Sequence, residues 1–214
     1  MEIDVWQISL AGEPAHCSAV LEKSELDRAA RFHFRRDQER FVIGRGSLRQ
    51  ILGNYLSATP DSIRFRYGPN GKPELEASEP LHFNLSHSHE VGLLAVAREQ
   101  PVGVDLEKIV PDRVDNTGIA ERFFTAAEAN RVRSAPAEQR ADVFYRIWTR
   151  KEAFLKGCGV GLARDLNQFE VSLEDAAIQG TDWMVHELRP CAGYVAAVAV
   201  ECARPNFQFR VWPQ

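Results

Sequence analysis

The sequence contains few of the features that mark secreted, membrane-spanning or disulfide-stabilised proteins. Its four cysteines are scattered through 214 residues without a C-x-x-C pair, so neither a disulfide framework nor a cysteine metal site is indicated. The start of the chain includes the acids Glu2 and Asp4, unlike the basic and then apolar start of a signal peptide. Its apolar runs fall far short of the roughly 20 residues of a membrane helix. We therefore expect a cytoplasmic protein that does not span a membrane.

Nucleotide-binding fingerprints are also missing. There is no Walker loop and no G-x-G-x-x-G motif, and the glycines at 159 and 161 lack the strand-to-helix context that such motifs need. The net charge of −4 argues against a general nucleic-acid-binding protein. Arginines nevertheless crowd the first quarter of the chain, where they would either meet phosphates or form a solvated helix face balanced by neighbouring acids. They are Arg28, Arg31, Arg35, Arg36, Arg40, Arg45 and Arg49.

What is present is enough apolar sequence for a large core. Hydrophobic residues make up 44% of the chain and charged residues 26%, which fits one large domain or two small ones. Periodicity and turn residues predict the order strand, helices, strands twice. In the first half we expect a strand over 1–10, a short helix from Ser24, a long helix over 37–56, a turn at 69–73 and strands at 81–85 and 91–97. In the second half we expect a strand over 102–109, helices over 119–132 and 142–156, and strands at 169–173, 183–188, 194–200 and 207–212.

The division between the two units is expected at residues 98–101. We predict an α+β fold with an N-terminal subdomain over residues 1–98 and a C-terminal subdomain over residues 102–214. Ligand sites often lie between two such units, so we expect the functional site at the junction. A cleft formed within one chain also favours a monomer.

Two acids stand close to this junction. Asp105 and Glu107 are two residues apart on a predicted strand, so their side chains project from the same face. Neighbouring carboxylates repel each other unless a cation neutralises them, which favours a divalent metal site. Taken alone, however, alternate acids on a solvent-exposed strand are the commoner explanation of such a pattern.

A second group of charged residues lies on the long helix predicted in the second half. Glu152 and Lys156 are four residues apart and share one helix face with Trp148, a predicted core residue. Three closely spaced glycines then end the helix and would let backbone approach a ligand. An ordinary surface ion pair followed by a flexible helix exit is the alternative. The glycines are Gly157, Gly159 and Gly161.

Two short segments of the first half hold polar groups suited to phosphate. His87 lies between Ser86 and Ser88 at the end of a predicted strand, and imidazole and hydroxyl groups donate hydrogen bonds to phosphate oxygens. Lys72 lies in the tight turn Gly71-Lys72-Pro73, where a lysine offers a point charge. Exposed histidines and turn lysines without a ligand are common, so neither segment decides the function by itself.

The order and combination of these segments resemble the Sfp-type 4'-phosphopantetheinyl transferases, in the subfamily with a Trp and Lys-Glu-Ala signature. Residues 103–107, Gly-Val-Asp-Leu-Glu, resemble the metal motif of that family, and residues 148–156 resemble its second signature. Residues 123–128 are similar to the segment between them. Upstream, residues 71–73 and 84–88 also follow the family's order, so the resemblance covers most of the chain.

The resemblance implies two similar α/β subdomains with antiparallel sheets in a pseudo-twofold arrangement, with the active site at their interface. It implies that Asp105 and Glu107 bind Mg²⁺ or Mn²⁺, that Glu152 joins them as metal ligand, general base or both, and that Lys156 holds the pyrophosphate of coenzyme A. Glu25 departs from the family at a position where relatives often carry a basic residue, so the outer phosphate contacts are expected to differ. The implied catalytic residues are Glu152, Lys156 and Asp105, and the implied coenzyme A contacts are Arg40, Lys72, Ser86, His87, Ser88, Lys156 and Arg28.

The implied activity is transfer of the 4'-phosphopantetheine arm of coenzyme A to a serine of an acyl or peptidyl carrier protein, with release of 3',5'-ADP. The carrier would belong to fatty acid, polyketide or nonribosomal peptide biosynthesis. Such a partner is expected to be acidic and helical, and residues 117–133 offer an amphipathic helix with a basic rim to dock it. The alternative for this segment is that Phe123 and Phe124 are core residues. The alternatives are a metal-dependent phosphoester hydrolase and a coenzyme A or carrier-binding module without catalysis.

Overall fold

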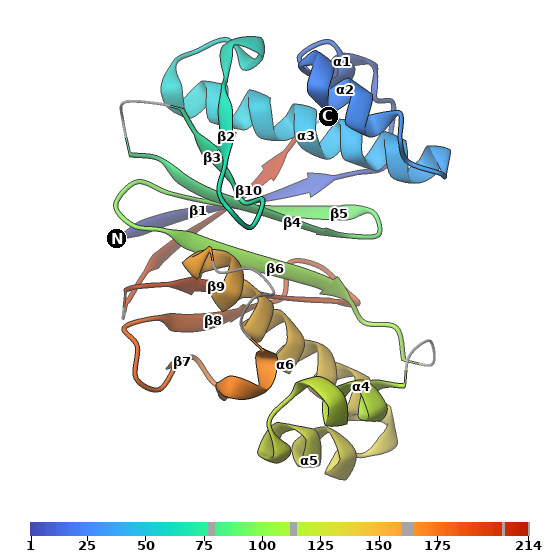
Figure 1. Ribbon diagram of the computed structural model, residues 1–214, viewed down its shortest axis with the longest axis vertical. Helices are drawn as coiled ribbons and strands as arrows, with labels where there is room; N and C mark the ends of the chain where they lie inside the picture. The colour runs from blue at the N-terminus through green and yellow to red at the C-terminus, as the bar shows by residue number, and fades with distance from the viewer. Residues whose placement is uncertain (77–79, 112–114, 160–164, 203, 214) are drawn as a thin grey trace.

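The overall shape is a stack of two halves. The computed structural model describes residues 1–76, 80–111, 115–159, 165–202 and 204–213. In Figure 1 each half contains one four-stranded sheet with a long helix on its outer side. Three apolar clusters join the layers, which follow one another as long helix, sheet, sheet, long helix. None of the helices within these ranges is long and apolar enough to cross a membrane.

The first half is built around a long helix. Its elements are β1 (Glu2–Ser9), α1 (Ala15–Ser18), α2 (Lys23–Ala29), α3 (Arg35–Leu56), a 3-10 turn (Pro60–Ser62), β2 (Phe65–Tyr67), β3 (Pro73–Leu75), β4 (His82–Ser88) and β5 (Val91–Ala97). Helix α3 covers one face of the sheet because its apolar residues recur at helical spacing. Leu48, Ile51 and Leu52 are buried there against Leu94 and Val96 of β5.

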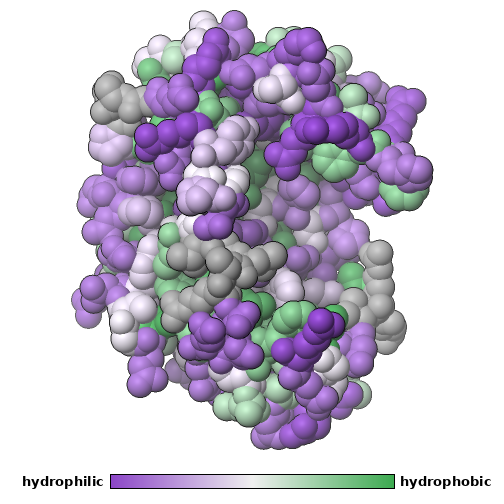
Figure 2. All heavy atoms as spheres, in the orientation of Figure 1, coloured by the Kyte–Doolittle hydropathy of each residue, from purple (hydrophilic) through white to green (hydrophobic). Residues whose placement is uncertain are grey.

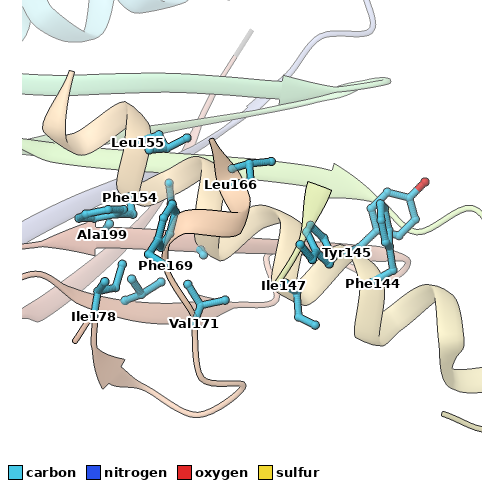
Figure 3. Packing of buried hydrophobic residues seen from close by; sticks show 14 of the residues in the cluster. Phe144, Tyr145, Ile147, Phe154, Leu155, Leu166, Phe169, Val171, Ile178 and Ala199 are labelled. Atoms are coloured by element: carbon cyan, nitrogen blue, oxygen red, sulfur yellow. The ribbon is translucent and has the colours of Figure 1, made fainter. Parts of the chain in front are cut away.

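The second half repeats this plan with a second long helix. Its elements are β6 (Val102–Lys108), α4 (Asn116–Phe123), α5 (Ala126–Ser134), α6 (Ala137–Cys158), a 3-10 turn (Leu166–Gln168), β7 (Ala176–Ala177), β8 (Met184–Leu188), β9 (Tyr194–Val200) and β10 (Asn206–Trp212). Figure 3 shows Phe154 of α6 beside Phe169 in the core under this helix. Contact between α6 and β6 requires a glycine, because a Cβ at Gly103 would collide with the backbone of Ala153 and Gly157. Gly103 therefore brings the helix directly onto the strand.

The two sheets share one strand order. β1 pairs with β5 and β5 with β4, while β6 pairs with β9 and β9 with β8, all antiparallel. The helices α3 and α6 are both 22 residues long, and each covers the outer face of its own sheet. The predicted α+β fold with two similar halves in a pseudo-twofold arrangement is confirmed.

The last strand crosses from one half to the other. β10 pairs in parallel with β1, from Glu2 opposite Asn206 to Ile8 opposite Trp212. It can do so because β9 ends close to the first sheet and only a short connection separates it from β10. The predicted subdomain boundaries at 98 and 102 stay a prediction, but the strand expected at 207–212 extends the first sheet rather than the second.

Each predicted helix begins at another residue than expected, and for two of them a capping box explains the difference. The single helix expected over 119–132 is two helices, because the Thr125 side chain caps α5 and forms a capping box with Glu128. The short helix expected from Ser24 begins one residue earlier, and its capping box joins Glu22 to Glu25. Both corrections follow from a side chain that satisfies backbone N–H groups at a helix start.

The strand expected over 169–173 is irregular in the structure. The backbone N–H of Val171 donates to Glu128 Oε1 at 2.9 Å, so a side chain takes the place of a neighbouring strand. Phe169 and Val171 are still buried in the core of the second half. The apolar pattern therefore predicted burial correctly and the backbone conformation wrongly.

The orientation of β6 decides where its acids point. Val102, Val104 and Leu106 are fully buried in the apolar cluster between the two sheets. Because side chains alternate along a strand, Asp105 and Glu107 project from the opposite face. That face is the one covered by α6.

Candidate active site at the junction of the two halves

An ion pair joins α6 to β6 at the centre of the junction. Lys156 Nζ lies 2.5 Å from Asp105 Oδ1 and donates to Ser86 Oγ of β4 at 3.1 Å. Asp105 is only 4% exposed, so its charge is compensated inside the protein rather than by water. Strands of both halves and the helix α6 thus meet at one lysine.

Two further acids crowd this ion pair. Burial, and after it the charge of Asp105, raises the pKa of Glu107 to about 7. The same two causes, in the same order, raise the pKa of Glu152. Lys156 acts in the opposite direction on both acids, but its effect is smaller. The junction therefore holds more negative charge than its own lysine compensates.

The residues fit a divalent cation. Asp105 Oδ2 and Glu152 Oε1 are buried and have no hydrogen-bond partner in the structure. An unsatisfied buried carboxylate oxygen is costly, and Mg²⁺ prefers ligands of this hard, anionic kind. Among the residues that the structure describes, no three His, Cys, Asp or Glu side chains are already gathered as a metal cluster. Binding one ion therefore requires the acids to draw closer together.

Strand β4 approaches the free edge of β6 with polar side chains. Asn84, Ser86 and Ser88 alternate along β4 and are buried. Ser86 Oγ donates to Asp105 Oδ1 at 2.9 Å, and Ser88 Oγ donates to Glu107 Oε2 at 2.8 Å. The structure therefore brings both predicted serines to the acids of β6.

His87 and Arg40 lie near this group. His87 alternates with the two serines and so projects from the other face of β4. Desolvation of the imidazole by the atoms packed around it is the largest cause that lowers the pKa of His87, and the charges of Lys156 and Arg40 lower it further. Part of the residue still reaches solvent. Arg40 Nη2 lies 3.4 Å from Glu90 Oε1. Both side chains lie at the edge of the junction.

The surface is indented beside this junction. Figure 2 shows a hollow at its right edge, between the two halves. In Figure 1 the turn between β4 and β5 and the end of β6 point to the same side. The hollow lies between the two halves, on the side toward which these strand ends point.

Lys72 is held at the other end of β6. Its Nζ donates to the carbonyl oxygens of Val102 at 3.3 Å and Gly157 at 3.1 Å. Burial lowers the pKa of Lys72. The side chain lines a cavity of about 370 Å³ and joins the β2–β3 hairpin to the second half. The structure does not bring Lys72 together with Asp105 and Glu107.

Arg28 lines a different cavity in the first half. This cavity of about 230 Å³ also contains Arg31, Arg45 and Phe41, and the Arg28 guanidinium lies 5.2 Å from the centre of the Phe41 ring. Glu25 reaches the same cavity, but its carboxylate pairs with Arg45 and Arg49. The acid that departs from the family pattern is therefore neutralised by its own half.

The glycines after Lys156 have separate roles. Gly157 lies within α6, where a Cβ would meet the ring of Trp183. Gly159 ends the helix with a φ of 69°, the left-handed conformation that glycine adopts most easily. Gly161 lies outside the described residues. The prediction that glycines end the helix is thus confirmed at Gly159 and wrong at Gly157.

Lys151 is a residue whose role the sequence did not reveal. It is completely buried, and its Nζ lies 2.8 Å from Glu128 Oε2. It also donates to the carbonyl oxygens of Leu166 and Phe169. Because Glu152 is its neighbour in α6, this contact fixes the turn of helix that carries the acid. The T-x-x-E pattern at residues 125–128 was the available signal, since it marks Glu128 as a capping residue.

Comparison with known proteins defines the class. The family model of the 4'-phosphopantetheinyl transferase superfamily matches residues 101–199, and the model of the N-terminal region of 4'-phosphopantetheinyl transferases matches residues 6–99. The two matches meet at the junction of the two halves. The chain belongs to the 4'-phosphopantetheinyl transferase family.

Named relatives agree with this membership. The 4'-phosphopantetheinyl transferase HetI of Nostoc sp. is 42% identical over 209 residues, which cover 93% of this chain and 87% of the relative. A 4'-phosphopantetheinyl transferase of Bacillus subtilis is 34% identical over 77% of this chain and 72% of its own length. The Sfp protein of Bacillus subtilis strain 168 is 31% identical over 72% of this chain and 66% of its own length.

Proposed function

We propose that this protein transfers the 4'-phosphopantetheine arm of coenzyme A to a serine of an acyl or peptidyl carrier protein and releases 3',5'-ADP. The observation that carries the proposal is the meeting of Asp105 with Lys156 beside two further acids. In this set, the lysine offers a positive charge to the pyrophosphate of coenzyme A. The carboxylates offer ligands for a metal ion and an acceptor for a proton. The names of the relatives support the same activity.

The chemistry follows from these charges. The carrier serine oxygen forms a bond to the β-phosphorus of coenzyme A, and the bond from that phosphorus to the bridging oxygen breaks, so that 3',5'-ADP leaves with the electron pair. Glu152 accepts the serine proton, and its raised pKa makes it a stronger base than an exposed glutamate. The Lys156 ammonium holds the pyrophosphate and stabilises the charge that builds on it.

The carboxylates would hold a divalent ion, Mg²⁺ or Mn²⁺. Asp105, Glu107 and Glu152 are the residues we assign to it, with Glu152 sharing the roles of ligand and base. When bound, such an ion neutralises charge on the pyrophosphate oxygens. The unpartnered oxygens of Asp105 and Glu152 support this assignment.

The nucleotide end of coenzyme A is assigned to the first half. His87 and Arg40 border the junction, and the arginine-lined cavity at Arg28 and Phe41 suits a phosphate beside a planar base. Lys72 keeps its predicted role as a phosphate contact only if its ammonium leaves the two carbonyl oxygens that it now binds. We propose it as the weakest of these contacts.

The carrier protein is assigned to α4 and α5. Phe123 is 39% exposed, whereas its neighbour Phe124 is buried, so one of the two aromatic residues is free to meet a partner. The exposed Arg131 and Arg133 supply the basic rim of α5. An acidic helical carrier would complement this surface. We propose a monomeric cytoplasmic enzyme.

A mass-shift assay tests the function. A panel of apo carrier proteins is incubated with coenzyme A and Mg²⁺, and each carrier is weighed by mass spectrometry with and without a chelator. The expected result is a gain of one phosphopantetheine that requires the carrier serine and disappears with chelator. Release of phosphate or ADP without any carrier would contradict the proposal and favour a hydrolase. Binding without reaction would favour a non-catalytic module.

A further inference from the structure

The contact between β4 and β6 is made by side chains rather than by paired backbones. β4 and β6 are the edge strands of their sheets, and such strands present backbone N–H groups that need partners. Each of three alternate side chains of β4 accepts one of them. Asn84 Oδ1 accepts from Val104 N at 2.8 Å, Ser86 Oγ from Leu106 N at 3.2 Å, and Ser88 Oγ from Lys108 N at 3.2 Å.

The hydroxyl of Ser86 has no hydrogen-bonding capacity left. A serine hydroxyl can donate once and accept twice. Ser86 donates to Asp105 and accepts from Leu106 N and from Lys156 Nζ. All three positions are used within the protein, so none remains for a phosphate of coenzyme A while these contacts hold.

The hydroxyl of Ser88 is committed in the same way. It donates to Glu107 and accepts from the backbone N–H of Lys108. His89 Nδ1 lies 3.4 Å from the same oxygen and occupies its remaining side. Each serine thus holds the carboxylate of one residue of β6 and the backbone of the next.

We propose that Ser86 and Ser88 are positioning residues, which fix the carboxylates of Asp105 and Glu107 for metal binding instead of contacting coenzyme A. The proposal rests on the proposed function, and it gives a different role to two residues that the family resemblance implied as coenzyme A contacts. Strand β4 of the first half then sets the geometry of acids that belong to the second half. Within this segment His87, which projects from the opposite face of β4, remains for the nucleotide.

Asn84 provides a control within the same strand. It makes the same kind of bond to β6, through Val104 N, but the residue before Val104 is Gly103, which has no carboxylate. Loss of the Asn84 side chain therefore weakens the contact between β4 and β6 without releasing an acid. The two effects of the serines, on the fold and on the acids, can be separated by comparison with this position.

The experiment measures metal binding without coenzyme A or carrier. The full chain is freed of metal with a chelator and titrated with Mn²⁺ in a calorimeter, as wild type, Ser88→Ala, Ser86→Ala, Ser88→Thr and Asn84→Ala. Backbone amide exchange of residues 104, 106 and 108 is followed on the same samples. A second readout is the KM for coenzyme A in the transfer assay.

The two alanine variants of the serines are expected to bind Mn²⁺ at least about tenfold more weakly, as is usual when a partner of a metal ligand is removed. Ser88→Thr, which keeps the hydroxyl, should restore binding. Asn84→Ala should speed amide exchange at Val104 and leave Mn²⁺ affinity unchanged. Unchanged Mn²⁺ affinity in both serine variants, with a raised KM for coenzyme A, would overturn the proposal.

Two provisions keep the outcome interpretable. If Ser88→Ala does not fold, Ser88→Cys takes its place, because a cysteine side chain has a similar size and its thiol is only a weak hydrogen-bond donor. The expected loss of Mn²⁺ affinity is the same for this variant. The Mn²⁺ titration does not depend on transfer. A wild-type protein that binds Mn²⁺ but transfers nothing would therefore refute the proposed function and leave the test of the serines valid.

Discussion

The long helices α3 and α6 carry the same internal brace, one in each half of the molecule. The fifteenth residue of each helix is a completely buried cation, Arg49 in α3 and Lys151 in α6. Each cation pairs with a glutamate of the short helix before it, at 2.7 Å to Glu25 and at 2.8 Å to Glu128. Both glutamates are the third residue of their helix and belong to a capping box.

The cation of each brace also binds the backbone of the segment that follows its long helix. Arg49 Nη1 donates to the carbonyl oxygens of Pro60 and Ile63, and Lys151 Nζ donates to those of Leu166 and Phe169. A buried cation of this kind is stable only when an anion and hydrogen-bond acceptors compensate its lost hydration. The pseudo-twofold relation therefore extends from the strand order to single side chains.

The two helices differ in what stands next to the brace. In α6 the brace is followed by Glu152 and, four residues later, by Lys156, whereas the same positions of α3 hold Gln50 and Asn54. The brace is thus a structural element shared by the two helices, and the residues that we propose for the chemistry are found at these positions in α6 and not in α3. We infer that the first half supplies support and nucleotide contacts, and the second half supplies the chemistry.

Replacing Glu152 by glutamine tests this difference most strongly. We expect a loss of transfer on the order of a thousand-fold, because the variant lacks both the proposed base and one of the charges proposed to bind the metal. Thermal stability should stay the same or rise, since the buried carboxylate is costly in the metal-free protein. The measurement is single-turnover mass spectrometry of the carrier. Gln50→Ala, at the matching position of α3, is the control, and equal losses in both variants would remove the asymmetry.

Breaking either brace tests the similarity. Lys151→Met leaves the buried Glu128 without its cation, and Arg49→Met leaves the buried Glu25 with Arg45 as its remaining cation. Because each variant breaks a buried ion pair, we expect each to lower the free energy of unfolding by about 3–5 kcal/mol. Urea denaturation of the metal-free protein measures both. Lys23→Met serves as control, because the Lys23 side chain is 87% exposed and its removal should cost under about 0.5 kcal/mol. A small loss in only one brace variant would show that the two braces are not equivalent.

The acids of the two halves should respond to pH with opposite sign. The folded protein raises the pKa of Glu107 from 4.5 to about 7, so the stability linked to this proton is present below pH 4.5 and is lost as the pH rises through 7. Burial raises the pKa of Glu25, but Arg49 and Arg45 outweigh it and lower the pKa overall. The stability linked to Glu25 is therefore lost as the pH falls.

The variant Glu107→Gln isolates the first of these effects. In the presence of a chelator, its free energy of unfolding at pH 8 should exceed that of the wild type by about 2–3 kcal/mol. Near pH 4.5 the two proteins should have the same free energy of unfolding. Thermal unfolding across this pH range measures the difference, and added Mg²⁺ should reduce it by stabilising the wild type alone. A difference that does not change with pH would contradict the raised pKa.

The smallest expected effect concerns the outer surfaces of the two halves. Phe123→Ala should raise the KM for the carrier roughly five- to thirtyfold, which corresponds to a loss of about 1–2 kcal/mol of binding free energy. The KM for coenzyme A should stay unchanged. Phe34→Ala removes a more exposed aromatic residue of the first half and should leave both values unchanged. If Phe34→Ala has the larger effect on the carrier, the docking surface belongs to the first half instead.

Much of this arrangement could be predicted from the sequence because it depends on local patterns. The 3.6-residue period located α3 and α6, and runs of β-type apolar residues between turn residues located β5 and β9. The same-face rule correctly aligned Asp105 with Glu107. The motif order then identified the family, since the spacing of several weak signals is far more specific than any one of them.

The remaining features depend on contacts between distant segments. Nothing near Lys151 shows that its partner lies in a different helix, so the charged stretch around it does not reveal its burial. The direction of Ser86 and Ser88 depends on how two sheets pack, which no single strand records. The irregular path at Val171 depends on Glu128, a side chain more than forty residues away.

Strand β10 has a consequence for how the protein is made. Glu2 pairs opposite Asn206, so the first sheet cannot be completed until residues 206–212 have left the ribosome. During synthesis the N-terminal half normally folds first, and here it must wait with one edge of β1 uncovered, a template for pairing with other chains. Pairing of β10 with β1 therefore completes the sheet of the half that was synthesised first.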